Sequence, residues 1–515
     1  MNSIRDFERI TFRKIEQAVF RIACEVLVEI IKPLLEGMDE EIFKKRDKKR
    51  FKPIDRKERT IESILGVPVT FKRRYYKDLK TGSYTFLLDE ALGLSKGARQ
   101  SPLLREVAVH MAVDGPSYRT ASKNLERILG GRVISHEGIR QNLIKASDEA
   151  KALFEKEKKH ERPKENPGII FIEVDGVHAS LQKQSRRSTE EKVGVIHTGW
   201  EPRSECQGEY MLKGKRIVRT QSLSPEEFWS IVSETVYREF KINEDTVIVI
   251  NGDRANWIRM FREWFCDCNV LYQIDRFHLL RTLGGIFKRG SEAYCKLKDT
   301  MDKDPTGATF MAALAEESVN LSGKKQKEAE ALIKDLEGIA DSVCDYRVRL
   351  SAMGYDIEGL RPMGAAEAQI NTFVHRIKGR GQSWSPSGLD GMMRLLGLKF
   401  EGRLEKLLYD FAVTQEPLLR PLSSKKKLVK KTALEVANTL IKRYGDIWSH
   451  SMPVLNVGRT RSGDLSRLFH SMSESSFGGY FFIRPRESVV CIIWFSMRHK
   501  SPPRMTRQSM RNVPR

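Results

Sequence analysis

The sequence has no long apolar run, and this absence argues against an integral membrane protein. Its most apolar late stretch, residues 489–495, is much shorter than the ~20 residues that a membrane-spanning helix needs. Charged residues also stand near the amino terminus, where a signal peptide would be apolar. We therefore expect a protein that is neither inserted in a membrane nor secreted.

Cysteine is also scarce, with seven residues in a chain of 515. Only Cys266 and Cys268 lie near each other, and no second pair of Cys or His follows at the spacing of a zinc site. Small apolar residues beside a strand are the simplest interpretation of this pair. We expect reduced thiols, as in a cytoplasmic protein.

Acidic residues are outnumbered, because 68 Asp and Glu stand against 90 Lys and Arg and give a formal net charge of +22. Such an excess favours polyanionic partners. Nucleic acid is the first candidate, and an anionic membrane surface is the second. The length of the chain predicts roughly two to four structural units.

The first 150 residues predict a mainly helical DNA-binding region that contains a β-hairpin. Apolar residues at helical spacing predict a helix followed by a basic connector within residues 1–58. The β-rich runs at 67–76 and 82–88 predict the hairpin, whose Arg73 and Arg74 could contact a DNA backbone. A small sheet that packs on neighbouring helices is an equally good interpretation.

A helix-turn-helix pattern closes this region, which we place at 59–150. Ser135 stands where it can cap a helix that begins at His136, and the turn before it contains glycine. In a DNA-binding role, His136, Arg140 and Gln141 would enter a major groove. An ordinary helical hairpin is the alternative.

A charged linker at 151–166 leads into a region where apolar strand runs alternate with helices, which predicts an α/β sheet covered by helices. The strand runs are 169–174, 193–198, 246–250 and 270–274. Residues 279–358 show no convincing strand and predict a helical insertion. The core would therefore consist of 167–278 and 359–450, followed by a basic tail at 451–515 for which we predict no fold.

Several strands of this core end in a carboxylate. Each acid has a structural interpretation of its own: Asp175 precedes a glycine, as in a hairpin turn; Asp253 and Asp275 stand at helix-cap positions; and Glu367 opens a helix. Glu173, on the same strand face as Asp175, is a spare carboxylate. Ligands of α/β sheets bind at the carboxyl ends of strands, so the recurrence favours a cation site.

Carboxylate oxygens are the ligands that Mg²⁺ and Mn²⁺ prefer. Two such ions, held by Asp175, Asp253 and Glu367, would activate a water or a 3′ hydroxyl and stabilise the leaving oxygen of a phosphodiester. His278 lies one helical turn after Asp275, so both side chains could contact the scissile phosphate. A buried core histidine is the alternative for His278.

These motifs resemble those of DDE-type insertion-sequence transposases, specifically the Lre type of a bacterial family long described as uncharacterised and related to the Mutator-like group. The resemblance spans about residues 60 to 450. It is carried by Glu-Val-Asp-Gly-Val-His at 173–178, Gly-Asp-Arg-Ala-Asn-Trp-Ile at 252–258, Asp-Arg-Phe-His at 275–278 and Met-Gly-Ala-Ala-Glu at 363–367. The resemblance implies a ribonuclease-H-like catalytic core, interrupted by a helical insertion before the third acid, Glu367.

The resemblance also implies DNA contacts near the active site from Arg376, Lys378, Arg380 and Trp384, although burial in the core is the alternative for Trp384. A transposase would bind terminal inverted repeats and target DNA as a homodimer or larger synaptic assembly, in the bacterial cytoplasm at the nucleoid. The segment from about residue 471 does not resemble the usual end of the family. A DNA-binding remnant that acts as a repressor, or a structure-selective nuclease on the same core, is the alternative function.

Overall fold

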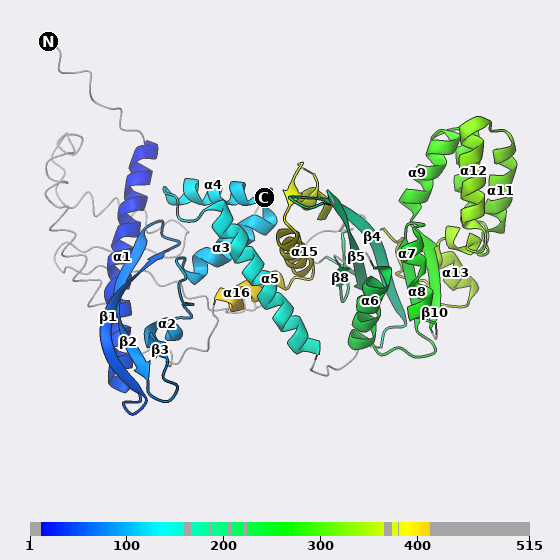
Figure 1. Ribbon diagram of the computed structural model, residues 1–515. Helices are drawn as coiled ribbons and strands as arrows, with labels where there is room; N and C mark the ends of the chain where they lie inside the picture. The colour runs from blue at the N-terminus through cyan, green and yellow to red at the C-terminus, as the bar shows by residue number, and fades with distance from the viewer. Residues whose placement is uncertain are drawn as a thin grey trace, which may run out of the picture. The chain divides into compact units, whose positions relative to one another are not determined.

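The computed structural model describes residues 12–158, 166–185, 187–203, 209–220, 224–266, 268–364, 373–379 and 381–412. The chain divides into two compact units (Figure 1). Among the described residues, the first unit holds 12–101 and 129–133, and the second holds 102–128 and 134–412.

The first unit is a helix packed on a small antiparallel sheet. Its elements are α1 (Phe12–Lys45), β1 (Phe51–Glu62), β2 (Pro68–Asp78), β3 (Tyr84–Thr85) and α2 (Leu87–Ala91), and the strand order is β1-β2-β3. Val28 of α1 packs on Ile61, Phe71 and Leu88. The basic run 44–50 connects α1 to β1, as expected, but the residues after it form β1, which pairs with β2 along its length. The predicted hairpin partner of β2, residues 82–88, is mostly not a strand: only Tyr84–Thr85 pairs with β2, and α2 begins at Leu87.

Three helices begin the second unit: α3 (Pro102–Asp114), α4 (Tyr118–Leu129) and α5 (His136–Lys158). The predicted cap of α5 is confirmed, since Ser135 Oγ accepts a hydrogen bond from Gly138 N (3.0 Å). The last described helices, α15 (Pro386–Phe400) and α16 (Leu404–Ala412), pack on α5 and α3 respectively.

A mixed sheet forms the centre of the second unit, and the predicted α/β class is confirmed. The strands follow the order β10-β9-β4-β5-β8, and β11 pairs with the end of β4. Neighbours β4, β5 and β8 are antiparallel, whereas β9 and β10 run parallel to β4. Their bounds are β4 (Ile169–Leu181), β5 (Ser188–His197), β8 (Arg216–Thr220), β9 (Val247–Gly252), β10 (Asn269–Ile274) and β11 (Ser383–Trp384).

The Asp-Gly pair of β4 does not form the hairpin turn that its sequence favours. Asp175 pairs with Val193, and Gly176 pairs with Lys192, so the β4–β5 ladder continues through both residues. A Cβ atom at Gly176 would contact only the flexible side chain of Glu190 on β5, so the structure shows neither a turn nor a backbone contact that requires glycine here.

Helices cover the sheet and connect its strands. Between β8 and β9 lies α6 (Pro225–Glu239), and the short helices α7 (Asn256–Arg259) and α8 (Phe261–Trp264) connect β9 to β10. The ribbon of β6 (Trp200–Pro202) and β7 (Tyr210–Leu212) follows β5. The predicted helical stretch after β10 contains α9 (Arg276–Phe287), α10 (Glu292–Thr300), α11 (Ala308–Val319), α12 (Gly323–Leu336), η1 (Ala340–Val343) and α13 (Tyr346–Ala352).

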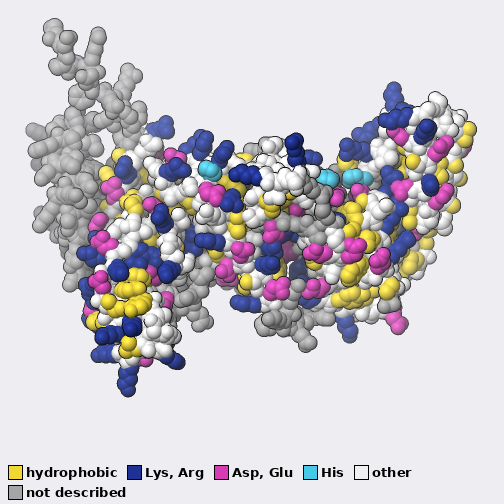
Figure 2. Space-filling model, viewed as in Figure 1, with side chains coloured by type: hydrophobic (Ala, Val, Ile, Leu, Met, Phe, Trp, Pro, Cys, Tyr) yellow, Lys and Arg dark blue, Asp and Glu magenta, His cyan; other side chains and the backbone are white. Residues whose placement is uncertain are grey.

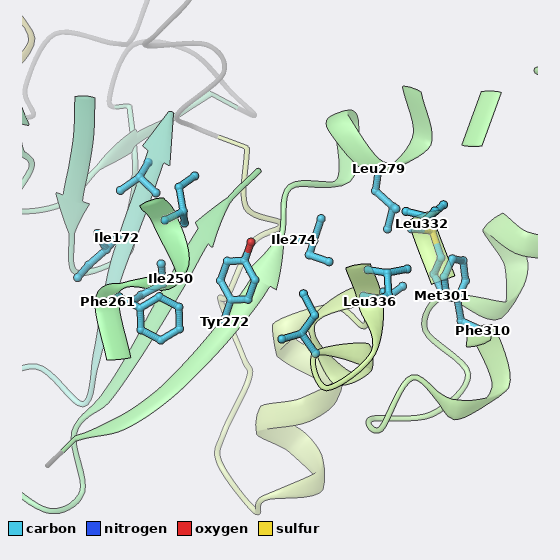
Figure 3. Packing of buried hydrophobic residues seen from close by; sticks show 14 of the residues in the cluster. Ile172, Ile250, Phe261, Tyr272, Ile274, Leu279, Met301, Phe310, Leu332 and Leu336 are labelled. Carbon is cyan, nitrogen blue, oxygen red and sulfur yellow. The ribbon is translucent and has the colours of Figure 1, made fainter. Parts of the chain in front are cut away.

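One apolar core runs from the sheet into these inserted helices (Figure 3). Ile250 and Ile274 of the strands belong to the same cluster as Leu279, Phe310 and Leu336 of the helices. The opposite face of the sheet carries a smaller cluster around Phe171 and Tyr346. No helix among the described residues combines the length and apolar character of a membrane-spanning segment.

Because the insertion shares its core with the sheet, a cavity in α12 should destabilise the whole second unit. Leu336 is fully buried, and we expect Leu336→Ala to lower the free energy of unfolding by about 2–5 kcal/mol. Val319→Ala is the control, because Val319 of α11 is 80% exposed and its truncation should change stability by about 0.5 kcal/mol or less. Denaturant unfolding of the full chain would measure both, and equal midpoints would show that the insertion is not part of the core.

Candidate active site

Three aspartates lie near one another, two just after the carboxyl ends of β9 and β10 and one on the adjacent middle part of β4. The register pairs Glu173 with Asn251, and Asn251 with Gln273. Asp253 and Asp275 directly follow these ladders. Asp275 N donates to the carbonyl oxygen of Gly252 (2.7 Å), and the negative charges of Asp253 and Asp275 both act on Asp175. The structure thus brings together the three acids that the sequence singled out.

Burial raises the pKa of Asp175 to about 6. The negative charges of Asp253 and Asp275 raise it as well, while a hydrogen bond from the Gly176 amide and the charge of His278 lower it. The pKa of Asp175 thus depends on the charges of Asp253, Asp275 and His278, which are the other predicted site residues that the structure describes. Neighbouring carboxylates of this kind make a site that favours a proton or a cation.

Asp253 holds the loop that follows β9. Its Oδ1 accepts a hydrogen bond from Ala255 N (2.9 Å), and its carbonyl oxygen accepts one from the Tyr272 hydroxyl (2.6 Å). The N-cap of α7 is Ala255, so Asp253 does not cap that helix in the predicted way. Its other carboxylate oxygen has no hydrogen-bond partner among the residues that the structure describes.

Asp275 is the N-cap of α9, as predicted, because its Oδ1 accepts from His278 N (3.0 Å). Its Oδ2 accepts from Asn251 Nδ2 (3.3 Å). His278 is partly exposed, its ring packs edge-on against Phe277, and its charge acts on Asp175. The structure therefore supports the placement of His278 at the site over its alternative as a buried core residue.

A second polar row lies under the aspartates and was largely missed by the sequence analysis. Glu173, Asn251 and Gln273 are respectively 0%, 2% and 2% exposed. Each stands two residues before one of the three aspartates in the sequence. A polar residue at that spacing in three apolar strands was the signal that could have revealed the row.

The third predicted acid, Glu367, lies outside the described residues, and so does Arg380. Gly364 is the last described residue before Glu367, and its backbone N donates to Oε2 of Glu173 (3.0 Å). The described chain thus reaches the polar row three residues before Glu367.

The donor chemistry at the row of aspartates fits a divalent cation. Carboxylates are hard oxygen ligands, and a bound cation would offset the repulsion that helps to raise the pKa of Asp175. Within the described ranges, no group of three His, Cys, Asp or Glu side chains is already arranged to hold a metal ion. Asp175, Asp253 and Asp275 are the described residues that could contribute ligands.

Arg73 and Arg74, predicted to contact DNA, are buried in the first unit. Arg73 pairs with Asp89 (2.8 Å), and Arg74 pairs with Asp39 (2.7 Å) and with Glu40. Both guanidinium groups are thus occupied by partners inside the protein. This arrangement favours the alternative interpretation, a small sheet packed on neighbouring helices.

Arg376 and Trp384 are also buried. Arg376 donates to the carbonyl oxygen of Ala112 (2.9 Å) and lies over the ring of Trp384, 5.1 Å from its centroid. Trp384 Nε1 donates to the carbonyl oxygen of Ile377 (2.9 Å). These contacts favour the interpretation of Trp384 as a core residue over stacking on a displaced base.

The remaining predicted DNA contacts lie at the surface. His136, Gln141 and Lys378 are exposed. Arg140 is partly exposed and pairs with Glu137 one turn earlier on α5 (2.7 Å). An exposed ion pair of this kind is weak, so Arg140 can exchange it for another anion at little cost.

The comparisons with known proteins identify the family. Residues 5–407 match the Uncharacterised protein family UPF0236, and the chain belongs to it. A UPF0236 protein of Caldanaerobacter subterraneus subsp. tengcongensis is 25% identical over 378 residues, which cover 71% of this chain and 74% of that protein. A UPF0236 protein from the vanSb 3′ region of Streptococcus gallolyticus is 25% identical over 411 residues, covering 76% and 84% respectively.

Among solved structures, the chain matches the Drosophila P element transposase strand transfer complex. The match covers 76% of this chain and 90% of that chain, with 11% sequence identity and a TM-score of 0.23. A TM-score at this level does not establish a shared fold.

The raised pKa of Asp175 gives a pH test of the site. Between about pH 4 and 6 the folded protein holds a proton that the unfolded chain releases, so stability should fall as the pH rises through this window. Asp175→Asn removes the free-energy cost of ionising a buried carboxylate beside Asp253 and Asp275. With divalent ions chelated, we expect this variant to melt a few degrees above the unchanged protein at pH 7.5, and at the same temperature near pH 4.

Asp245→Asn is the matched control, because Asp245 is exposed and precedes the opposite end of β9. It should leave the melting temperature unchanged at both pH values. An Asp175→Asn variant that is no more stable than the unchanged protein at pH 7.5 would contradict the claim that burial and the charges of Asp253 and Asp275 make ionised Asp175 destabilising.

Proposed function

We propose that this protein is a DDE-type transposase of a bacterial insertion sequence. It binds terminal inverted repeats and target DNA, and it cuts and rejoins phosphodiester bonds with divalent metal ions. The observation that carries the proposal is the cluster of Asp175, Asp253 and Asp275 beside the carboxyl ends of β9 and β10, where burial and mutual repulsion raise the pKa of Asp175 to about 6.

The strand order supports a ribonuclease-H-like core. An antiparallel β4–β5–β8 meander is extended by the parallel strands β9 and β10, which is the sheet that the motif resemblance implies. The first acid lies on the central strand, the second follows the neighbouring strand, and a helical insertion stands before Glu367. Membership of an uncharacterised family is compatible with this proposal and does not by itself assign an activity.

In the proposed mechanism, Asp175, Asp253 and Glu367 would hold two Mg²⁺ or Mn²⁺ ions. Bound there, such ions would supply a Lewis acid for the scissile phosphate and would lower the pKa of the attacking water or 3′ hydroxyl. Asp175 and Asp253 would offer their carboxylate oxygens as ligands beside the carboxyl end of β9. Asp275 fixes the first turn of α9 and thereby holds His278 beside Asp175, where its ring can contact a phosphate oxygen.

DNA binding rests on the net charge of +22 and on exposed residues of the second unit. His136, Arg140 and Gln141 on the first turns of α5 offer base or phosphate contacts, and Lys378 offers a phosphate contact. On the face shown in Figure 2, basic side chains are spread over the surface with acidic ones between them. Because the two ends of the insertion sequence must react together, we also propose that the protein acts as a homodimer or a larger synaptic assembly. It would do so in the cytoplasm, at the nucleoid.

The full chain should cut a DNA fragment that carries the element's own ends in Mg²⁺ or Mn²⁺, and not in chelator. Asp175→Asn and Asp253→Asn should each reduce cleavage by more than the roughly 10–100-fold that loss of an outer-shell partner costs, because each removes a metal ligand. Both variants should still bind the ends in gel-shift assays, since neither residue carries positive charge. The products are resolved on a sequencing gel.

Asp245→Asn is again the control and should cleave as the unchanged protein does. Cleavage that survives Asp175→Asn would contradict the proposal. Binding of the ends without any cleavage would support the inactive remnant or repressor. Cleavage of branched DNA regardless of the repeat sequence would support the structure-selective nuclease.

A further inference from the structure

A groove between α9 and α12 opens beside the candidate active site. Asp253 and His278, which the proposed mechanism uses, are among the residues that line it. Its volume is ≈ 810 Å³, within the range of pockets that bind small organic ligands. Every residue that lines the groove lies in the described part of the second unit. The groove therefore has room for a part of the substrate beyond the scissile phosphate.

One wall of the groove is a single face of α9. Its residues follow the three-four spacing of a helix face and are His278, Arg281, Thr282, Gly285 and Ile286. The first and the last of them lie eight residues, or roughly 12 Å, apart along the helix axis. A DNA strand carries one phosphate per roughly 3.4 Å of duplex axis, so this wall is long enough for about three phosphates.

The other wall is a single face of α12, which contributes Glu328, Ala331, Leu332 and Asp335 at the same spacing. Leu332 belongs to the buried core cluster that also contains Leu279 of α9 (Figure 3). Both walls thus rest on one packed core, which fixes the width of the groove. Its floor is apolar and suits the sugar and base atoms of a nucleotide.

A glycine leaves the wall formed by α9 open. Gly285 is exposed, and a Cβ atom there would meet nothing within 4 Å. Glycine makes a helix less stable than alanine does, and the structure shows no packing reason for it at this position. What Gly285 provides is free space inside the groove.

The groove contains a cation without an acidic partner. Arg281 is exposed, and none of the described residues forms an ion pair with it. The acids of α12 are already engaged: Asp335 pairs with Arg254 (2.9 Å) and Arg259 (2.6 Å), and Glu328 pairs with a lysine one turn earlier (3.5 Å). Arg281 is therefore available to an anion that enters the groove.

We propose that the groove between α9 and α12 binds the DNA strand next to the scissile phosphate, with Arg281 holding one of its phosphates. This inference rests on the proposed function, which places the scissile phosphate beside His278. Arg281 stands one turn after His278 on the same face of α9, so a strand that contacts His278 reaches Arg281 next. Sugar and base atoms of the strand lie against Ile286 and Leu332 on the floor.

Arg281→Gln removes the charge and keeps a polar side chain. We expect this variant to bind a DNA fragment that carries the element's ends at least about tenfold more weakly, because it loses a hydrogen bond to a charged group. The slope of log affinity against log salt concentration should become shallower by about 0.9, the value for one phosphate contact. Fluorescence anisotropy over a salt series measures both quantities. Chelator is present throughout, so the measurement needs neither metal nor cleavage.

Arg262→Gln is the matched control. Arg262 of α8 is also an exposed arginine without an ion pair among the described residues, but it does not line the groove. The two variants lose the same charge, and Arg262→Gln should change the affinity and the salt slope much less. Equal effects would show that Arg281 acts only through the net charge of the protein, which would overturn the proposal.

Gly285→Leu fills the groove without removing any charge. The new side chain meets open space and favours the helix, so the variant should melt at the same or a higher temperature. Binding of the ends should nevertheless weaken at least as much as in Arg281→Gln. Ala315→Leu, at an exposed position of α11 outside the groove, should keep the affinity of the unchanged protein. Full affinity in Gly285→Leu would show that the strand does not enter the groove.

Neutral methylphosphonate groups at single positions of the DNA locate the contact. Arg281→Gln should be non-additive with one neutralised phosphate within about three nucleotides of the element's end, and additive with all others. Non-additivity at no position would rule out a direct phosphate contact. Non-additivity only at a distant position would rule out the placement next to the scissile phosphate.

The outcomes separate this inference from the proposed function. Full binding by Arg281→Gln, with cleavage by the unchanged protein, would overturn the role of the groove and leave the transposase proposal intact. Binding that depends on Arg281, without cleavage by the unchanged protein, would support the groove and count against the proposed catalysis. A protein that binds no DNA would overturn both.

Discussion

The parallel register of β4, β9 and β10 is the constraint on which the candidate site depends. It places Glu173, Asn251 and Gln273 side by side on three strands, and it brings Asp253 and Asp275, which follow β9 and β10, close to Asp175 of β4. A shift of one residue in either ladder would turn these side chains into the apolar core on the other face. Burial of the apolar residues in all three strands therefore favours this register, and the register brings the residues of the candidate site together.

The two rows meet the cost of burial in different ways. In the lower row, the Asn251 amide, the His197 imidazole and the Gly364 backbone N–H lie at hydrogen-bond distance from the oxygens of Glu173. In the upper row each aspartate accepts a hydrogen bond from a backbone amide, yet burial together with neighbouring negative charge still raises the pKa of Asp175. A fold that satisfies one carboxylate and leaves the adjacent ones crowded creates a place where an external cation is favoured.

Much of this arrangement could be predicted from the sequence, because it depends on local pattern. The apolar runs predict the strands, and the acids near their ends predict where on the sheet the candidate site lies. Short-range spacing alone predicts that Ser135 and Asp275 cap helices. Other features depend on distant partners. The Asp-Gly pair of β4 favours a turn locally, yet the ladder with β5 keeps it extended. Arg73 looked free to bind DNA because nothing in its neighbourhood predicts the ion pair with Asp89.

The inserted helices are part of the site and not an appendage to it. Asp335 of α12 accepts from Arg254 (2.9 Å) and from Arg259 (2.6 Å), the residues that flank the start of the connection after Asp253. The apolar core of α12 continues into the sheet, so Asp335 is held on a rigid element. The loop that carries Asp253 is therefore fixed from one side by β9 and from the other by a helix some eighty residues later in the chain. A helical insertion that only separated two parts of the chain would need no such ion pairs. The ion pairs of Asp335 with Arg254 and Arg259 instead indicate that the inserted helices help to set the geometry of the candidate site.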